Sequence, residues 1–478
     1  MKKNVLYIGI VLLGMVLGSC HDFLNEYPKD QVYATNTDDL NELLVGNGYI
    51  PSSSLDIGVW FNLMDDDVFF FRTSATRAAG CEFHWWEPAP GTLSTWNALY
   101  KRIGVINAVL EEVEEFKDEP GIGYRKVKGE AHFLRGAYYY FLVNLYGQPY
   151  RAETAATELG VPLKLYAKVE DKRYDRQTVK TCYDQILTDL EAAITCLEGI
   201  TPTSTFRAGE AAARILLSRV YLYLGEWEKC VSQCDAILKS SSYRLRDFNT
   251  LGNAATTNVN SANSPETIFT SGGNNYAAMV FNPIFSPRYM GSEEVINLYS
   301  LDDLRKRYFF QGTAGNGPKK QVNTNDGVCS DFFLLRLAEV YLNRAEALAM
   351  LSRDAEAIED VKRLREKRLE TGSVDVLSYT GEALMNFIRD ERRREFTFEG
   401  HRWFDLRRYA VSPKWPFQKE IRHPYYEDNA MEVNGNMVLL KYDEDREYYV
   451  LPIPENEIML NGGTLIQNSE RAWKEPVR

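Results

Sequence analysis

Apolar side chains recur at steps of three and four along several long stretches of the chain. Residues 130–146 show this spacing, with Leu134 and Tyr138 among the apolar positions, and it returns in residues 209–224 and 333–351. An α-helix makes one turn every 3.6 residues, so this spacing lays the apolar side chains along one face. The pattern predicts three amphipathic helices.

Two of these helices are followed directly by another one. A tight turn at Gly225 leads into the apolar-patterned residues 227–239, and a turn after residue 351 leads into residues 355–369. Two amphipathic helices joined by a tight turn form an αα-hairpin, and stacked hairpins are typical of tetratricopeptide-type repeats. We therefore expect a mainly α fold, a tetratricopeptide-like scaffold of helical hairpins with long irregular insertions.

The predicted insertions are residues 47–95, 147–173 and 240–331. They are rich in Gly, Pro, Asn, Ser and aromatic residues, and the gaps between the helical hairpins are too uneven for a clean tandem repeat. Connections of this length inside a compact domain usually carry function. We expect the helices to be the scaffold and the insertions to hold the functional surface.

The N-terminus predicts export. Lys2 and Lys3 precede an apolar stretch from Val5 to Leu17, which is shorter than the roughly 20 residues that cross a bilayer. The stretch is typical of a signal peptide, and residues 17–20 resemble a bacterial lipobox ending in a cysteine. We predict a signal peptide at residues 1–19 and lipidation of Cys20; an ordinary secretory signal with an incidental cysteine is the alternative.

Composition and missing motifs narrow the function. The 478 residues include 55 Lys and Arg against 67 Asp and Glu, a net charge of −12, and the chain has no basic run, which argues against nucleic acid as a partner. Motifs for a zinc protease, a serine hydrolase and a nucleotide-binding loop are lacking, and none of the five His lies at metal-ligand spacing from another. We expect no catalysis, no cofactor and no metal. Residues 65–67, three aspartates, could bind calcium, although turn and capping carboxylates are the simpler interpretation.

Six cysteines remain besides Cys20. Cys182 and Cys196 fall on one predicted helix, and Cys230 and Cys234 fall four residues apart on another. These spacings favour free cysteines buried as small apolar side chains. The state of Cys81 and Cys329 stays open.

Several segments together resemble the SusD/RagB family of nutrient-binding lipoproteins. They are Asp22–Asn25, Glu130–Phe141, Leu145–Gly147, Tyr183–Ile186, Asp189–Glu191, Arg336–Glu346, Glu391–Glu395, Glu399–Arg408, Leu451–Pro454 and Gln467–Asn468. They occur in the family's order and cover nearly the whole chain after Cys20. The resemblance implies an α-α superhelix, with an N-terminal region at residues 20–230 and a C-terminal region at residues 231–478 in one integrated unit.

The resemblance also implies a function. Members are surface lipoproteins of the outer membrane that bind a nutrient and deliver it to a TonB-dependent, SusC-like β-barrel transporter, and for this chain we expect the nutrient to be an oligosaccharide or other glycan. Relatives also serve peptide import, so a peptide ligand stays open. Two other classes stay open as well: a surface glycosidase or peptidase, and a protein adaptor that uses the concave face of the repeat.

The charged segment 391–408 has two interpretations. Glu391, Glu395 and Glu399 are spaced four residues apart, with Arg392, Arg394 and Arg402 three to four residues from them. Such spacing is typical of a helix face stabilised by ion pairs. We interpret the segment as structural rather than catalytic.

Candidate ligand-binding residues come from two insertions. Sugars present flat apolar C–H faces ringed by hydroxyl groups, so their receptors combine aromatic rings with amides, carboxylates and arginine. Adjacent tryptophans in a loop flanked by Pro and Gly are hard to bury on both sides, which favours the first insertion. The predicted ligand-binding residues are Trp60, Asp67, Arg72, Trp85, Trp86, Asn274, Asn275, Tyr276 and Tyr289. The alternative is that the aromatic rings among them fix the long loops onto the helical scaffold.

Overall fold

The computed structural model describes residues 34–51, 62–71, 80–88, 95–168, 170, 172–271, 289–312, 315–322, 325–374, 377–427, 430 and 432–478. The predicted signal peptide and Cys20 lie outside these residues, as do Trp60, Arg72, Asn274, Asn275 and Tyr276. The roles predicted for them therefore stay predictions.

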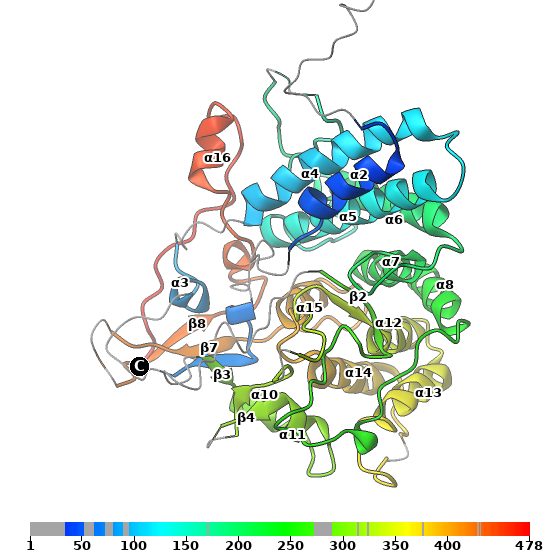
Figure 1. Cartoon of the computed structure of the whole chain (residues 1–478). Helices are drawn as coiled ribbons and strands as arrows, with labels where there is room; N and C mark the ends of the chain where they lie inside the picture. Colours follow the sequence, from blue (N-terminus) through cyan, green and yellow to red (C-terminus); the bar gives the residue numbers. More distant parts are fainter. Residues whose placement is uncertain are drawn as a thin grey trace, which may run out of the picture.

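Long helices stack side by side in a curved array (Figure 1). They are α4 (Thr95–Glu112), α5 (Gly123–Tyr146), α6 (Val179–Leu197), α7 (Glu210–Leu224), α8 (Trp227–Leu238), α12 (Leu337–Met350), α13 (Asp354–Arg365) and α14 (Gly381–Phe396). Helix α5 packs between α4 and α6, α7 packs against α6 and α8, and α12 packs against α8, α13 and α14. The mainly α fold built from helical hairpins is confirmed. No helix in the described part of the chain is both long and apolar enough to cross a membrane.

The predicted helices match the structure, with two main differences, one of which is that the helix predicted at 355–369 ends at Arg365. Residues 130–146 lie in α5, and the two predicted hairpins are α7–α8 and α12–α13. At the start of the third helix, however, residues 334–336 form strand β6 (Leu334–Arg336), and α12 begins only at Leu337. This strand pairs with β2 (Thr267–Thr270), a partner that helical periodicity cannot reveal.

Glycines allow close contact between α5 and α6. A Cβ atom on Gly129 of α5 would lie 2.6 Å from Leu197 Cγ of α6, and one on Gly136 would lie 3.2 Å from the Leu190 side chain. Two carbon atoms cannot lie 2.6 Å apart unless one of them moves, so any larger residue at position 129 would push the helices apart. Glycine at this position therefore lets α5 and α6 pack closely.

Short elements fill the rest of the described chain. They are α2 (Thr37–Leu43), the π-helix Leu44–Gly48, β1 (Val68–Phe70), α3 (Cys81–His84), the 3₁₀ turn Val113–Phe116, the 3₁₀ turn Phe248–Thr250, β3 (Tyr289–Gly291), α10 (Glu293–Ile296), α11 (Arg305–Phe309), β4 (Phe310–Gln311), β5 (Gly317–Pro318), α15 (Arg402–Ala410), β7 (Ile421–Pro424), β8 (Asn436–Leu439), the 3₁₀ turn Arg446–Tyr449 and α16 (Glu455–Leu460). The strands form antiparallel two-stranded sheets, β1–β3, β2–β6, β4–β5 and β7–β8. Figure 1 shows many of these elements gathered beside the helical array.

The two predicted regions of the chain share a hydrophobic core. One cluster of buried side chains contains residues from Leu40 to Leu465 and includes members from both regions. The predicted boundary after Cys230 falls inside α8. The division at residue 230 stays a prediction that the fold does not mark with a linker.

None of the six described cysteines forms a disulfide with another described cysteine, and all except half-buried Cys196 are buried. Cys182 and Cys196 share α6, and Cys230 and Cys234 share α8, as the spacing predicts.

Candidate functional site

Two of the predicted insertions meet in one corner of the molecule. Strand β1 of the first insertion (residues 47–95) pairs with β3 of the third (residues 240–331), so that Phe70 lies opposite Tyr289. Strand β7 packs against β1. We call residues 62–71, 80–88 and 289–291 together with β7 the insertion corner. The structure thus brings together two segments that the sequence separates by about 200 residues.

Three of the predicted ligand-binding rings are buried in the insertion corner. Trp85, Trp86 and Tyr289 are each exposed by 2% or less. The Trp85 indole N–H donates to Pro424 O at 3.0 Å, and the Trp86 indole N–H donates to Met64 O at 3.2 Å. The premise that adjacent tryptophans stay exposed is therefore wrong. Trp86 adopts a φ of 50°, which turns the chain sharply after α3 and lets both rings enter the core.

Two stacked histidines lie beneath these rings. The rings of His84 and His423 stack with centroids 3.7 Å apart, and His423 also stacks on Trp86 at 4.5 Å. The Phe70 backbone N–H donates to His84 Nε2, while His84 Nδ1 lies 2.7 Å from Leu63 O, which fits a neutral ring protonated on Nδ1.

His423 also joins separate segments. Its Nδ1 lies 2.6 Å from His84 O, and its Nε2 lies 2.9 Å from Asp65 O. Burial lowers the pKa of His423 to about 4, although the two carbonyl groups favour the charged ring. Burial and the neighbouring His423 also hold the pKa of His84 well below its usual range.

The three aspartates at 65–67 are buried, and two of them form ion pairs. Asp66 pairs with Arg402 at 2.7 Å and with Lys419 at 2.7 Å, while Asp67 pairs with Arg393 at 2.6 Å. Burial alone would raise the pKa of Asp66, but Arg393, Arg402 and Lys419 hold it well below its usual range. These contacts tie the first insertion to α14 and α15.

The ion pairs leave Asp67 in a structural position. Its side chain contacts Arg393, and the residue is 2% exposed, so a ligand could reach it only after rearrangement. Within the described residues no group of three or more His, Cys, Asp or Glu is placed to hold a metal ion. The interpretation of 65–67 as turn carboxylates holds for Asp65, which accepts the Asp67 backbone N–H at 2.9 Å, and needs correction for Asp66 and Asp67, which are buried partners of arginine.

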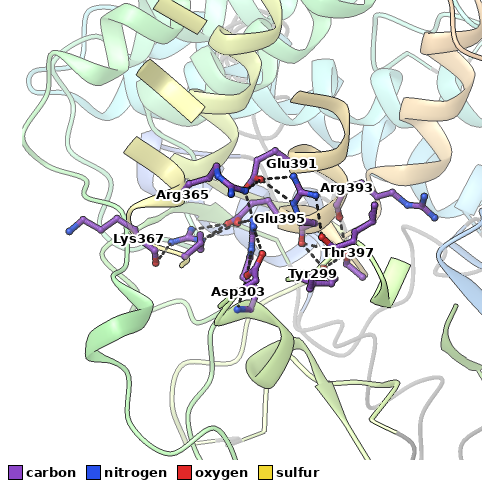
Figure 2. Close-up of polar contacts among 12 residues, drawn as sticks. Tyr299, Asp303, Arg365, Lys367, Glu391, Arg393, Glu395 and Thr397 are labelled. Atoms are coloured by element: carbon purple, nitrogen blue, oxygen red, sulfur yellow. Dashed lines mark hydrogen bonds and ion pairs between the residues drawn. The ribbon is translucent and has the colours of Figure 1, made fainter. Parts of the chain in front are cut away.

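The signature segment at 391–408 forms a buried ionic network. Glu391 and Glu395 on α14 are 0% exposed, and Glu399 just after the helix is 2% exposed. Figure 2 shows Glu391 and Glu395 in the middle of a group that includes Asp303 and Arg365. The pairs are Glu391 with Arg305, Arg365 and Arg394, Glu395 with Arg305, Arg336 and Arg368, and Glu399 with Arg336 and Lys320.

The partners in this network differ from those that the sequence predicts. Of the predicted neighbours, only Arg394 pairs with one of the three glutamates, whereas Arg392 pairs with Asp405 and Arg402 with Asp66. The other cations come from distant segments, so the prediction of local partners is wrong for Arg392 and Arg402, whereas the prediction of ion pairs is confirmed. Burial would raise the pKa of Glu395, but Arg368, Arg336 and Arg305 hold it well below its usual range. A carboxylate held in this way is a poor proton donor or base.

A small cleft opens at the end of the β7–β8 hairpin, close to Trp85. It has a volume of about 240 Å³ and is lined by Tyr425, Glu427, Asn434, Trp473, Glu475, Pro476 and Arg478. The Tyr425 ring contacts the Trp85 ring at 5.0 Å, so the cleft adjoins the insertion corner. Trp473 is 45% exposed. We call this the β7–β8 cleft.

Backbone pairing positions the walls of the β7–β8 cleft. Asn436 and Val477 exchange both of their backbone hydrogen bonds at 2.8 Å, which fixes the C-terminal segment beside β8. Gly435 is required here because its φ is +91° and a Cβ would lie 2.8 Å from Val477 O.

The β7–β8 cleft combines the groups that suit a sugar, and the sequence prediction missed it. Its lining supplies two aromatic rings, an amide, two carboxylates and a guanidinium group. The signal available in the sequence was Tyr425 directly after Pro424 and Trp473 shortly before Pro476. Because these two aromatic residues lie about 50 positions apart, only the fold brings them together.

Family models match two long parts of the chain. A family described as the SusD family matches residues 290–472, and a family described as starch-binding associating with outer membrane matches residues 55–222. The first match contains the ionic network, and the second contains the part of the insertion corner around β1 and α3.

Individual relatives agree with these matches. The SusD-like protein P2 of Formosa agariphila is 26% identical over 440 residues, which covers 78% of this chain and 79% of that protein. A SusD superfamily protein from Bacteroides thetaiotaomicron has a TM-score of 0.74 at 22% identity and covers 91% of this chain and 100% of its own. A SusD-like carbohydrate binding protein from Bacteroides vulgatus has a TM-score of 0.65 at 19% identity and covers 90% of this chain and 97% of its own.

Proposed function

Because the chain belongs to the SusD-like family, we propose that it is a glycan-binding lipoprotein of the outer membrane that delivers its ligand to a transporter. Lipidation at Cys20 would anchor it, and its partner would be a TonB-dependent, SusC-like β-barrel. The protein binds the glycan and does not cleave it.

One observation carries the choice of a glycan. The family that matches residues 55–222 is described as starch-binding, and this match includes the insertion segment that contains Trp60, Asp67 and Arg72. The β7–β8 cleft next to that segment offers aromatic rings and planar polar groups, which is the chemistry that sugars require. A peptide ligand is the second candidate, because aromatic and amide groups also suit peptides.

We propose ligand-binding residues from the insertions and from the β7–β8 cleft. Trp60, Arg72, Asn274, Asn275 and Tyr276 keep the role predicted for them, and Tyr425 and Trp473 join them from the β7–β8 cleft. Trp85, Trp86, Tyr289 and Asp67 are buried, so we propose that they act by holding this surface in place.

The buried ionic network supports a binding protein rather than a glycosidase. A glycosidase requires two carboxyl groups facing a substrate, one of them protonated at the working pH. Glu391, Glu395 and Glu399 face arginine and lysine side chains instead, and their pKa values are lowered. Hence the acidic residues of the signature segment do not supply this chemistry.

A glycan and peptide array tests the proposed ligand. We expect the protein starting after Cys20 to bind a defined set of oligosaccharides and to leave peptides unbound. Binding to peptides alone would replace the glycan with the second candidate. The anchor and the partner have tests of their own: an unmodified Cys20 in the mass spectrum of the membrane-derived protein would contradict lipidation, and purification from native membranes without any large β-barrel protein would contradict the transporter.

A further inference from the structure

A larger cleft opens beside the turn that joins α7 to α8. It has a volume of about 490 Å³, within the range of small-molecule sites. Its walls come from residues 150–154, from the α7–α8 turn and Trp227 after it, from residues 408–413 at and after the end of α15, and from Pro416, Gln418 and Asp443. None of its lining residues belongs to the insertion corner or to the β7–β8 cleft. We call it the hairpin cleft.

Four aromatic residues line the hairpin cleft, and one of them, Tyr409, is buried. Tyr150, Tyr223 and Trp227 are each half-buried, so their rings are fixed by the core and yet accessible in part. The Tyr150 ring is held edge-on by Tyr183 with centroids 5.3 Å apart. Among the residues that the structure describes, none accepts or donates a hydrogen bond at the Tyr150 hydroxyl or the Trp227 indole N–H. Both polar groups are available to a ligand.

Planar polar groups form the rim of the hairpin cleft. Arg151 and Asp443 face each other at 3.6 Å with side chains 35% and 60% exposed. Gln418 donates to Asp443 at 2.6 Å, which orients the carboxylate. Thr154 contributes a buried hydroxyl that has no hydrogen-bond partner within the described part of the chain.

The positive charge of Arg408 at the floor of the hairpin cleft is neutralised by nearby carboxylates. Arg408 forms an ion pair with Glu346 and donates to Asp405 at 2.8 Å, so its charge is already neutralised. The cleft therefore offers no uncompensated buried charge to attract an ionic ligand. Its chemistry suits a neutral molecule with an apolar face and several hydroxyl groups.

We infer that the hairpin cleft is a second saccharide-binding site, separate from the insertion corner. A neutral sugar ring would stack on Tyr150 or Trp227, and its hydroxyl groups would bond to Arg151, Gln418 and Asp443. The inference rests on the proposed function, because it assumes the same class of ligand. A second site on the same receptor raises the affinity for a long glycan by holding it at two points.

Fluorine NMR tests this site directly. The protein starting after Cys20 is labelled with 5-fluorotryptophan, and Trp227→Phe assigns the Trp227 signal among the eight tryptophans. The probes are maltoheptaose, cellohexaose, xylohexaose and mannohexaose. We expect at least one of them to shift the Trp227 signal saturably.

Variants separate this site from the insertion corner. Tyr150→Ala and Arg151→Ala should each weaken the response at Trp227 about tenfold, and Arg151→Ala covers the case in which Tyr150→Ala does not fold. Tyr379→Ala removes another tyrosine, 44% exposed and outside the cleft, and should change nothing. Saccharide binding measured by calorimetry with an unmoved Trp227 signal would overturn the second site and leave the proposed function intact. If none of the four saccharides binds, the second site is overturned for these ligands, and the glycan array decides the proposed function separately.

Discussion

At the scale of single residues, the insertion corner depends on a histidine that must stay neutral. His423 is 1% exposed, stacks between His84 and Trp86, and faces two backbone carbonyl groups. Its pKa is about 4 in the folded protein, against about 6.5 in an unfolded chain. The unfolded state therefore binds a proton first as the pH falls, and stability is lost between about pH 6.5 and pH 4.

We predict that His423→Asn reduces this loss. The shift from 6.5 to about 4 corresponds to at most about 3 kcal/mol of unfolding free energy. Asp65, whose pKa burial raises, changes stability in the opposite direction, so the comparison must be made between the parent and the variant. Urea unfolding at pH 7 and pH 4.5 measures the free energy of unfolding of the parent and of the variant. An equal loss of stability in these two proteins would show that His423 does not titrate in this range.

A second prediction at this scale concerns Glu395. Its carboxylate compensates Arg305, Arg336 and Arg368, so Glu395→Gln leaves buried cations without their partner. We expect a loss of about 3–5 kcal/mol in the free energy of unfolding. Glu359→Gln is the matched control, because it removes a glutamate from an exposed pair with Arg363, and it should have almost no effect. Urea unfolding that shows equal stability for both variants would contradict the role of the network.

Residue-level prediction from the sequence is limited by long-range partners. The spacing of Glu391, Glu395 and Glu399 indicates ion pairs correctly, yet most of their cations come from segments that no local pattern connects to them. Trp85 and Trp86 look exposed in a loop rich in Gly and Pro, and they are buried by contacts to Pro424 and Met64.

At the scale of elements, helices are predictable and short strands are not. The periodic pattern predicts α7–α8 and α12–α13 because a helix shows the same apolar spacing whichever element covers its buried face. Strands β1 and β3 have three residues each and pair across a long separation in sequence, so neither length nor alternation specifies their register. The β7–β8 cleft escapes prediction for the same reason.

The contact between α5 and α6 gives a prediction at this scale. Gly129→Ala places a methyl group 2.6 Å from Leu197 Cγ and should lower the free energy of unfolding by about 1 kcal/mol or more, despite the better helix propensity of alanine. Gly104→Ala in α4 is the matched control, since no atom lies within 4 Å of its Cβ, and it should stabilise the protein by roughly 0.5–1 kcal/mol. Thermal unfolding measures both, and destabilisation by both or by neither would contradict close packing at Gly129.

At the scale of the whole molecule, one hydrophobic core supports both the helical array and the irregular segments of the insertion corner. The buried cluster runs through the curved helical array and into the insertion corner, so the array serves as a rigid base for the irregular segments beside it (Figure 1). Asp66 and Asp67 connect the first insertion to α14 and α15 through Arg402 and Arg393. Rigid support of this kind keeps a binding surface in one shape and lowers the entropy lost when a ligand binds.

Isothermal titration of the protein starting after Cys20 with a glycan that binds on the array tests the central claim most directly. The ligand is recovered afterwards and its length is measured by chromatography. We predict saturable binding and recovery of the glycan at its original length. Shortened glycan products, or heat that shows no saturation, would contradict a protein that captures glycans without cleaving them.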